Sequence, residues 1–149
     1  MTIFIDADAS PVVRETVEIS TSYGIPCYIF CDFSHEIYVP PAKTIVVGSG
    51  PDAVDFALLP YVKTGDLVIT QDYGLAAIVL AKNAEALHHD GKFYDPFTID
   101  FLLARRHSNQ KKRRAGIRTK GPKKRTKQND DAFVQALTSY CKRQKTRNT

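Results

Sequence analysis

The sequence is poor in the features that mark secreted and membrane-spanning chains. It has three cysteines, Cys27, Cys31 and Cys141, and none of them forms a CxxC pair, which argues against a disulfide framework and for a reducing compartment. Its apolar runs, such as residues 75–81, are far shorter than the roughly 20 residues that a membrane span needs. The N-terminus lacks a basic region followed by a cleavage site. These absences predict a soluble, cytoplasmic protein with no membrane segment.

Basic residues are scarce in the first 100 residues, and acidic residues are scarce after them. Residues 1–100 contain 14 Asp and Glu against 5 Lys and Arg, whereas residues 101–149 contain 2 against 16, which gives formal charges of −9 and +14. An acidic half can gather hard metal ions, and a basic segment attracts polyanions. The division suggests a metal-dependent enzyme that acts on nucleic acid.

Short apolar runs alternate with helical patterns through the first hundred residues. The chain has 149 residues and 43% hydrophobic content, which is enough for one domain with its own core. The alternation is typical of βαβ units and predicts an α/β fold with a mostly parallel sheet. Cys27 and Cys31 lie on one face of a strand and are interpreted as core residues. Strands are expected at residues 2–5, 27–31, 44–47, 67–70 and 84–88, and helices from Ser10-Pro11, from Pro51, over residues 73–82 and from Thr98.

The composition changes sharply at Arg105. Of the 24 residues from 105 to 128, 12 are Lys or Arg, none is acidic, and the apolar ones are Ala115 and Ile117. Such a stretch cannot bury enough surface to fold independently, so an exposed or mobile segment is expected. The following residues, 129–142, predict a helix that docks on the α/β domain of residues 1–104 through Phe133, Ala136, Leu137 and Tyr140. Residues 143–149 form a basic tail.

Several aspartates follow the predicted strands directly. Asp6 and Asp8 follow the first strand, and Asp72 follows the fourth. Asp52 and Asp55 lie in the first turn of the helix after the third strand. In a doubly wound sheet the binding crevice lies at the carboxyl ends of the strands, where the strand order reverses. These side chains are expected to converge if the first and fourth strands are neighbours.

Converging carboxylates repel one another, by roughly 4 kcal/mol per pair at 4 Å near a protein surface, and a divalent cation removes that cost. Oxygen ligands favour Mg²⁺ or Mn²⁺. Structural roles remain open for three of these residues: Asp8 and Asp52 can stabilise a helix start, and Asp72 can form a turn. Asp6 is harder to explain structurally, because an unpaired charge at the end of an apolar strand is costly. The hydroxyls of Ser10 and Thr70 are supporting candidates that could hold a carboxylate or a water.

Four segments of the chain resemble the YaiI/YqxD family, an uncharacterised bacterial group placed among the PIN-like nuclease domains. The resemblance rests on residues 6–12 (DADASPV), 50–57 (GPDAVDFA), 65–76 (GDLVITQDYGLA) and 118–122 (RTKGP). It implies a Rossmann-like three-layer α/β/α sandwich whose acidic pocket binds Mg²⁺ or Mn²⁺ and hydrolyses RNA. On the matching positions, Asp6, Asp8, Asp55 and Asp72 are the implied catalytic and metal-site carboxylates, with Asp52 as a further metal ligand. The family motif usually has Cys where this chain has Ser10.

The basic segment is the expected nucleic-acid contact, because Lys and Arg gain affinity by releasing counterions from phosphates. Few aromatic residues are interleaved, so base readout by this segment should be poor. The alternative is that the basic segment contacts no ligand and only increases solubility. His88, His89 and His107 are interpreted as loop or surface residues. The candidate contacts are Lys111, Lys112, Arg113, Arg114, Arg118, Lys120, Lys123, Lys124 and Arg125.

Three functions of different class fit these patterns. The preferred one is a metal-dependent ribonuclease that uses the aspartates. The second is a nucleic-acid-binding protein with a vestigial pocket and no catalytic activity. The third is an enzyme of small phosphate compounds in which residues 48–50 (GSG) cradle an anion before a helix, although this glycine pattern is shorter than a phosphate-binding loop.

Overall fold

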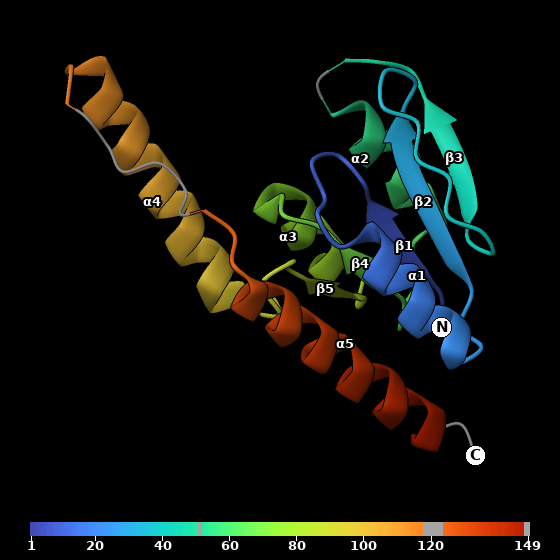
Figure 1. Cartoon of the computed structure of the whole chain (residues 1–149). Helices are drawn as coiled ribbons and strands as arrows, with labels where there is room; N and C mark the ends of the chain where they lie inside the picture. The colour runs from blue at the N-terminus through green and yellow to red at the C-terminus, as the bar shows by residue number, and fades with distance from the viewer. Residues whose placement is uncertain (51, 118–123, 148–149) are drawn as a thin grey trace.

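Residues 1–50, 52–117 and 124–147 are described by the structure, a computed structural model (Figure 1). The sheet has five strands: β1 (Ile3–Asp6), β2 (Cys27–Asp32), β3 (Lys43–Val47), β4 (Leu67–Ile69) and β5 (Glu85–Leu87). The helices are α1 (Val13–Ser22), α2 (Ala53–Leu58), α3 (Tyr73–Ala81), α4 (Pro96–Arg114) and α5 (Lys127–Arg147), and a short 3₁₀ turn, Leu59–Tyr61, follows α2.

The sheet is parallel throughout, and its strand order is β3-β2-β1-β4-β5. The chain therefore winds outward from β1 to one edge, returns to the centre, and continues to the other edge through β4. Ile5 pairs with Ile29 on one side and with Ile69 on the other. The first and fourth strands are adjacent, as predicted. The strand order reverses between them, so the crevice expected at a switch point lies at the carboxyl end of β1.

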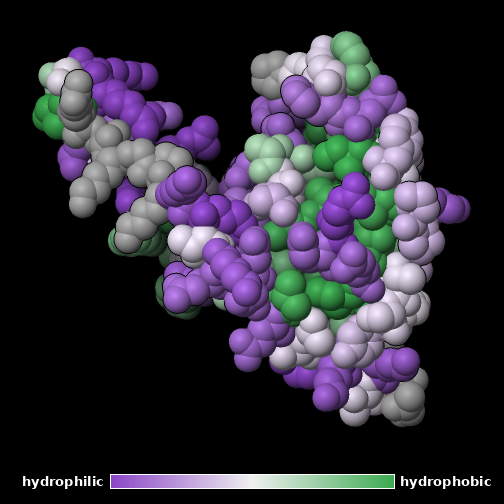
Figure 2. All heavy atoms as spheres, in the orientation of Figure 1, coloured by the Kyte–Doolittle hydropathy of each residue, from purple (hydrophilic) through white to green (hydrophobic). Residues whose placement is uncertain are grey.

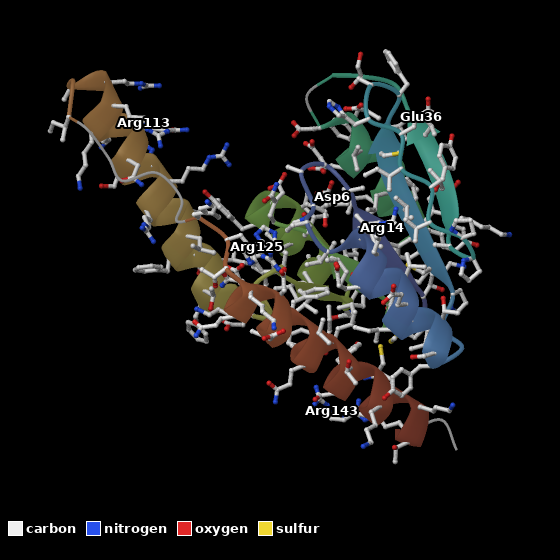
Figure 3. All side chains as sticks on the ribbon, in the orientation of Figure 1. Asp6, Arg14, Glu36, Arg113, Arg125 and Arg143 are labelled. Carbon is white, nitrogen blue, oxygen red and sulfur yellow. The ribbon has the colours of Figure 1, made fainter. Side chains whose placement is uncertain are left out.

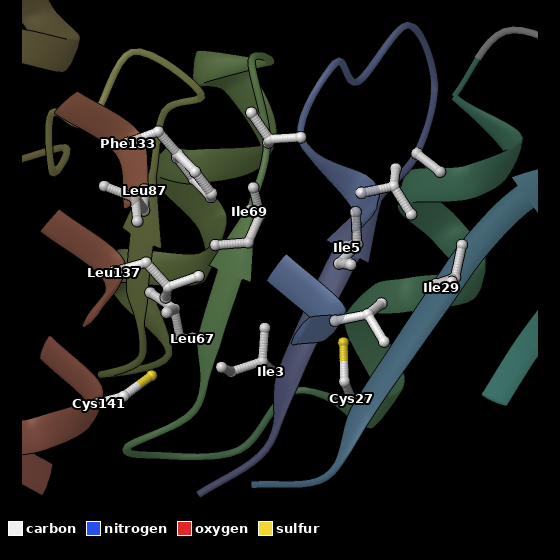
Figure 4. Packing of buried hydrophobic residues seen from close by; sticks show 14 of the residues in the cluster. Ile3, Ile5, Cys27, Ile29, Leu67, Ile69, Leu87, Phe133, Leu137 and Cys141 are labelled. Atoms are coloured by element: carbon white, nitrogen blue, oxygen red, sulfur yellow. The ribbon is translucent and has the colours of Figure 1, made fainter. Parts of the chain in front are cut away.

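Helices cover both faces of the sheet, so the molecule is a Rossmann-like three-layer sandwich, as predicted. On one face α1 and α5 pack on the isoleucines of β1 and their neighbours; Phe133 and Leu137 of α5 are fully buried there (Figure 4). On the other face α2, α3 and the start of α4 pack on Phe4, Phe30 and Val68. The last helix, α5, thus packs on this face of the sheet. Cys27 and Cys31 lie in the first core, also as expected.

The alternation of side chains along β1 decides where its last residue points. Ile3 and Ile5 belong to the core under α1 and α5, whereas Phe4 belongs to the core under α2 and α3. Because successive strand residues face opposite sides, Asp6 points to the side of α2 and α3. Its carboxylate is thus directed toward the starts of α2 and α3, where Asp52, Asp55 and Asp72 lie.

Three local features add to or differ from the expectations from the sequence. Helix α1 begins at Val13, and Ser10 does not cap it, because Ala9 takes a left-handed conformation (φ 54) and residues 7–10 form a turn of their own. Helix α4 continues to Arg114, so the first part of the basic segment is helical, with exposed side chains. The basic tail is helical to Arg147. The expected helical start at Pro51 lies outside the described residues.

Helix α4 leaves the body of the molecule. Its first turns contact α3, whereas its basic end projects away from the sheet (Figure 1), and its surface is hydrophilic over that stretch (Figure 2). Within the described residues, no helix has both the length and the apolar content to cross a membrane.

Candidate metal centre

A polar pocket of about 120 Å³ lies at the carboxyl edge of the sheet, where the strand order reverses. It is enclosed by the ends of β1 and β2, the loop before α2 and the loop before α3. Its acidic lining comprises Asp6, Asp8, Asp32, Asp52, Asp55 and Asp72. All five predicted carboxylates therefore meet in one pocket, together with a sixth, Asp32.

Three of these carboxylates are close enough to share one ion. Asp52, Asp55 and Asp72 each offer an oxygen, and these oxygens lie within 4.8 Å of one another. Asp6 and Asp8 line the same pocket but do not belong to this group. Asp52 precedes α2 in a left-handed conformation (φ 62), which Asp tolerates better than most residues, and its side chain forms no capping hydrogen bond. Its carboxylate is thus left for the pocket, which counts against a purely structural role for Asp52.

Asp72 lines the pocket and also caps a helix. Its Oδ1 accepts hydrogen bonds from the backbone N–H groups of Gly74 (2.8 Å) and Leu75 (3.3 Å), so the side chain caps α3. The structural role expected from the sequence was a turn; the structure has a helix cap in its place, and this cap fixes the orientation of the carboxylate. A Cβ at Gly74 would lie 3.1 Å from Asp72 Oδ1. The glycine therefore leaves room for this close approach.

Asp6 is buried and is held by Thr70. The Thr70 hydroxyl donates to Asp6 Oδ2 at 2.7 Å and accepts the backbone N–H of Asp72 at 3.0 Å, while the Asp8 N–H donates to Asp6 Oδ1 at 3.3 Å. The Tyr94 hydroxyl donates to the carbonyl oxygen of Thr70 at 3.1 Å. Thr70 thus links the ends of β1 and β4, as its candidate supporting role required. Tyr94 was not identified from the sequence.

The carboxylates of the pocket destabilise one another's charges. Burial, followed by the charges of Asp72 and Asp6, raises the pKa of Asp55 from 3.8 to about 7. Burial also raises the pKa of Asp6, with smaller contributions from the charges of Asp8 and Asp72, although the Thr70 hydrogen bond opposes the shift. Acidic residues whose pKa is raised by burial and by neighbouring charges are frequent at functional sites.

The donor set fits a hard divalent cation. Every acidic ligand atom is a carboxylate oxygen, which suits Mg²⁺ or Mn²⁺ better than zinc. Ion pairs within residues 1–50, 52–117 and 124–147 involve Asp32, Asp90 and Asp130, and none involves Asp6, Asp52, Asp55 or Asp72. The charge of the cluster is therefore not neutralised by a neighbouring Lys or Arg in the described structure.

Asp32 and Ser10 depart from the interpretation of the pocket from the sequence. Asp32 ends β2, next to β1, and its Oδ1 accepts the backbone N–H groups of Ser34 (2.8 Å) and His35 (3.1 Å). Asp32 could have been found by the pattern that identified Asp6, namely an Asp directly after an apolar strand. Ser10 does not line the acidic pocket; it lines a neighbouring cavity, and its hydroxyl is 3.5 Å from the N–H of Val12.

The predicted nucleic-acid contacts divide into two groups. Lys111, Lys112, Arg113 and Arg114 form the last turn of α4, exposed and far from Asp6 (Figure 3), and Lys124 is exposed as well. Arg125 is committed elsewhere: it donates to Asp130 (2.7 Å), to Asp90 (3.1 Å) and to the carbonyl oxygen of His89 (2.8 Å). Its assignment as a phosphate contact is not supported by this geometry. Arg118, Lys120 and Lys123 lie outside the described residues.

A second group of ligand atoms comes from the loop after β5. His88, His89 and Asp90 also bring one atom each within 4.8 Å of the others, which their sequence did not indicate. Asp90 already pairs with Arg125, and that cation disfavours a metal ion beside it. The helix after Gly48-Ser49-Gly50, α2, has only six residues, and the carboxylate of Asp52 at its start disfavours an anion there.

The fold and the pocket define a Rossmann-like α/β protein with an acidic site at the switch point of a parallel sheet. The family model described as "Uncharacterized BCR, YaiI/YqxD family" matches residues 4–143, and the chain belongs to this family. A UPF0178 protein of Exiguobacterium sibiricum is 48% identical over 138 residues, which cover 93% of this chain and 94% of that protein. One from Clostridium acetobutylicum is 42% identical over 97% of this chain and 99% of its own length. No solved structure is significantly similar.

Proposed function

We propose that this chain is a nuclease that hydrolyses phosphodiester bonds, with RNA as the expected substrate and Mg²⁺ or Mn²⁺ as its cofactor. The observation that carries the proposal is the group formed by Asp52, Asp55 and Asp72, whose oxygens lie within 4.8 Å of one another at the switch point of the sheet. We also propose, as part of this function, that the family is related to the PIN-like nuclease domains.

The chain's own residues would hold the ion and the attacking water. Asp52, Asp55 and Asp72 supply the ligand oxygens, with Asp6 and Asp8 beside them. A bound divalent ion would lower the pKa of a water and stabilise the departing oxygen.

Helix α4 offers a path for the nucleic-acid backbone. The guanidinium carbon of Arg106 lies 5.8 Å from the centre of the Tyr73 ring, and Tyr73 directly follows Asp72. From Arg106 to Arg114 the helix advances by about 12 Å. A strand bound along this face by its phosphates would run from the basic tip toward the acidic pocket.

The test is the cleavage of a labelled single-stranded RNA in Mn²⁺ by the wild type, Asp55→Asn and Asp72→Asn. Asn can still cap α3 at position 72. Because altering residues that merely orient metal ligands costs 10–100-fold, we expect each ligand variant to lose about 100-fold or more in rate. RNA binding in EDTA should persist. Asp131→Asn, at an exposed position on α5, is the matched control. Undiminished cleavage by both pocket variants would refute the assignment.

One observation favours a second candidate, an RNA-binding protein without catalysis. The basic tip at Lys111–Arg114 stands well away from Asp6 (Figure 3), so phosphates could be bound there without reaching the pocket. A chain that binds RNA equally in Mn²⁺ and in EDTA, that gains no thermal stability from Mn²⁺, and that leaves the RNA intact would select this alternative.

A further inference from the structure

A second, larger cavity adjoins the acidic pocket. It has a volume of about 330 Å³ and lies between the β1–α1 loop and the connection from β2 to β3. Its size falls at the lower end of the range for small-molecule sites. Its lining residues are Ala7, Asp8, Ala9, Ser10, Cys31, Asp32, His35 and Ile37.

The two cavities share a wall and differ in chemistry. Asp8 and Asp32 line both of them, so a ligand could occupy both at once. The acidic pocket is mainly polar, whereas the larger cavity is mainly apolar, with Ala7, Cys31 and Ile37 among its walls. A ligand that fits both has a phosphate at one end, to meet a metal ion, and an apolar group with hydrogen-bond donors at the other.

The shared carboxylates determine which donors the larger cavity accepts. Within the described residues, the hydrogen bonds that Asp32 accepts go to Oδ1, which leaves Oδ2 for a ligand. The hydrogen bond from the Ser34 hydroxyl, together with the N–H groups of Ser34 and His35, lowers the pKa of Asp32 and keeps it ionised. Asp8 is exposed beside it. Two anionic acceptors at one rim favour a group with adjacent N–H donors.

We propose that this cavity binds one unpaired nucleobase of the substrate that carries an exocyclic amino group, guanine above all. Guanine presents an imino N–H next to an amino group, which two carboxylates can accept together. The imino N–H of uracil lies between two carbonyl oxygens, which the same carboxylates repel. Because the Watson–Crick edge is used, the base must be unpaired, so the substrate is single-stranded at this position. The proposal rests on the proposed function for the identity of the ligand as a nucleotide.

The experiment is isothermal titration of the full chain with GMP, AMP, CMP and UMP in Mg²⁺. Since one good base-specific carboxylate contact corresponds to about a tenfold preference, we expect GMP to bind about tenfold more tightly than UMP. Asp32→Asn should abolish most of this preference, and Asp131→Asn should retain it. Ser10→Phe, which fills the cavity, should weaken binding of all four nucleotides while leaving the Mn²⁺-induced thermal shift unchanged.

The outcomes separate this proposal from the nuclease. Equal affinities for the four nucleotides, no binding of any, or an unchanged preference in Asp32→Asn would each overturn the base site. RNA cleavage would then still support the nuclease. A guanine preference that Asp32→Asn removes, in a chain that cleaves no RNA, would support the base site and refute the nuclease. If Ser10→Phe fails to fold in a circular dichroism melt, the Asp32→Asn titration alone decides.

Discussion

Asp55→Asn should stabilise the metal-free protein at neutral pH. A carboxyl whose pKa rises on folding binds its proton more tightly in the folded state, so the free energy of unfolding falls as pH rises from about 4 to about 7. The whole difference between 3.8 and about 7 would correspond to about 4 kcal/mol at 1.36 kcal/mol per pKa unit. Because part of the side chain faces solvent, screening reduces the effect, and we expect about 1–2 kcal/mol.

The assay is urea unfolding in EDTA at pH 4.5, 6 and 7.5. The wild type should lose stability across this range, and Asp55→Asn should lose less and exceed the wild type by about 1–2 kcal/mol at pH 7.5. Asp6, whose pKa is also raised, keeps a residual slope in the variant. Saturating Mn²⁺ should stabilise the wild type more than the variant.

The result that would refute this reasoning is a variant no more stable than the wild type at pH 7.5, with the same dependence on pH. The Asp55 carboxylate would then not be crowded by Asp72 and Asp6. Asp131→Asn serves again as the control, because it removes one carboxylate from an exposed position on α5 and should leave the pH slope unchanged.

Three glycine substitutions separate effects on stability from effects on the site. Gly91→Ala should lower the melting temperature by about 4–8 °C, since its φ is +86 and a Cβ would lie 2.6 Å from the Ala132 carbonyl oxygen. Gly65→Ala is the control, because Gly65 has a similar φ of +87 but no atom within 4 Å of the added Cβ, and it should lower the melting temperature clearly less. Equal melting temperatures of Gly91→Ala and Gly65→Ala would contradict this packing. For Gly74→Ala we expect a melting temperature within a few degrees of the wild type, because the higher helix propensity of Ala offsets the crowding of Asp72. The same substitution should weaken Mn²⁺ binding about tenfold by displacing Asp72. An unchanged Mn²⁺ titration would show that Gly74 is not needed.

The sequence predicted the strands and the meeting of their acidic ends well. Each strand is a short apolar run, and the usual winding of a parallel sheet placed the first strand beside the fourth, so the convergence of Asp6 with Asp72 followed from topology alone. Asp32 was missed although it obeys the same rule. It ends the second strand, which is also a neighbour of the first, but no helix pattern follows it to mark the strand end as part of a βαβ unit.

Other features depend on conformations that no residue pattern specifies. The left-handed backbone of Asp52 places one carboxylate in the pocket, and that of Ala9 delays the start of α1. Ala usually avoids this conformation and Asp only tolerates it, so neither residue type predicts it. The role of Arg125 depends on two acidic partners, Asp90 being 35 residues away in sequence. Nothing in a run of Lys and Arg shows which of its members is paired in the folded chain.

The commitment of Arg125 also changes how salt titrations of RNA binding are to be interpreted. The side chains of Arg125, Asp90 and Asp130 are 22%, 39% and 48% exposed. Added salt therefore weakens these ion pairs at the start of α5 as well as any contact with phosphate. Loosening of the junction adds its own ionic-strength dependence to the measured affinity. If RNA binds along α4 as proposed, a log–log plot of its affinity against salt would therefore overstate the number of phosphates that α4 contacts.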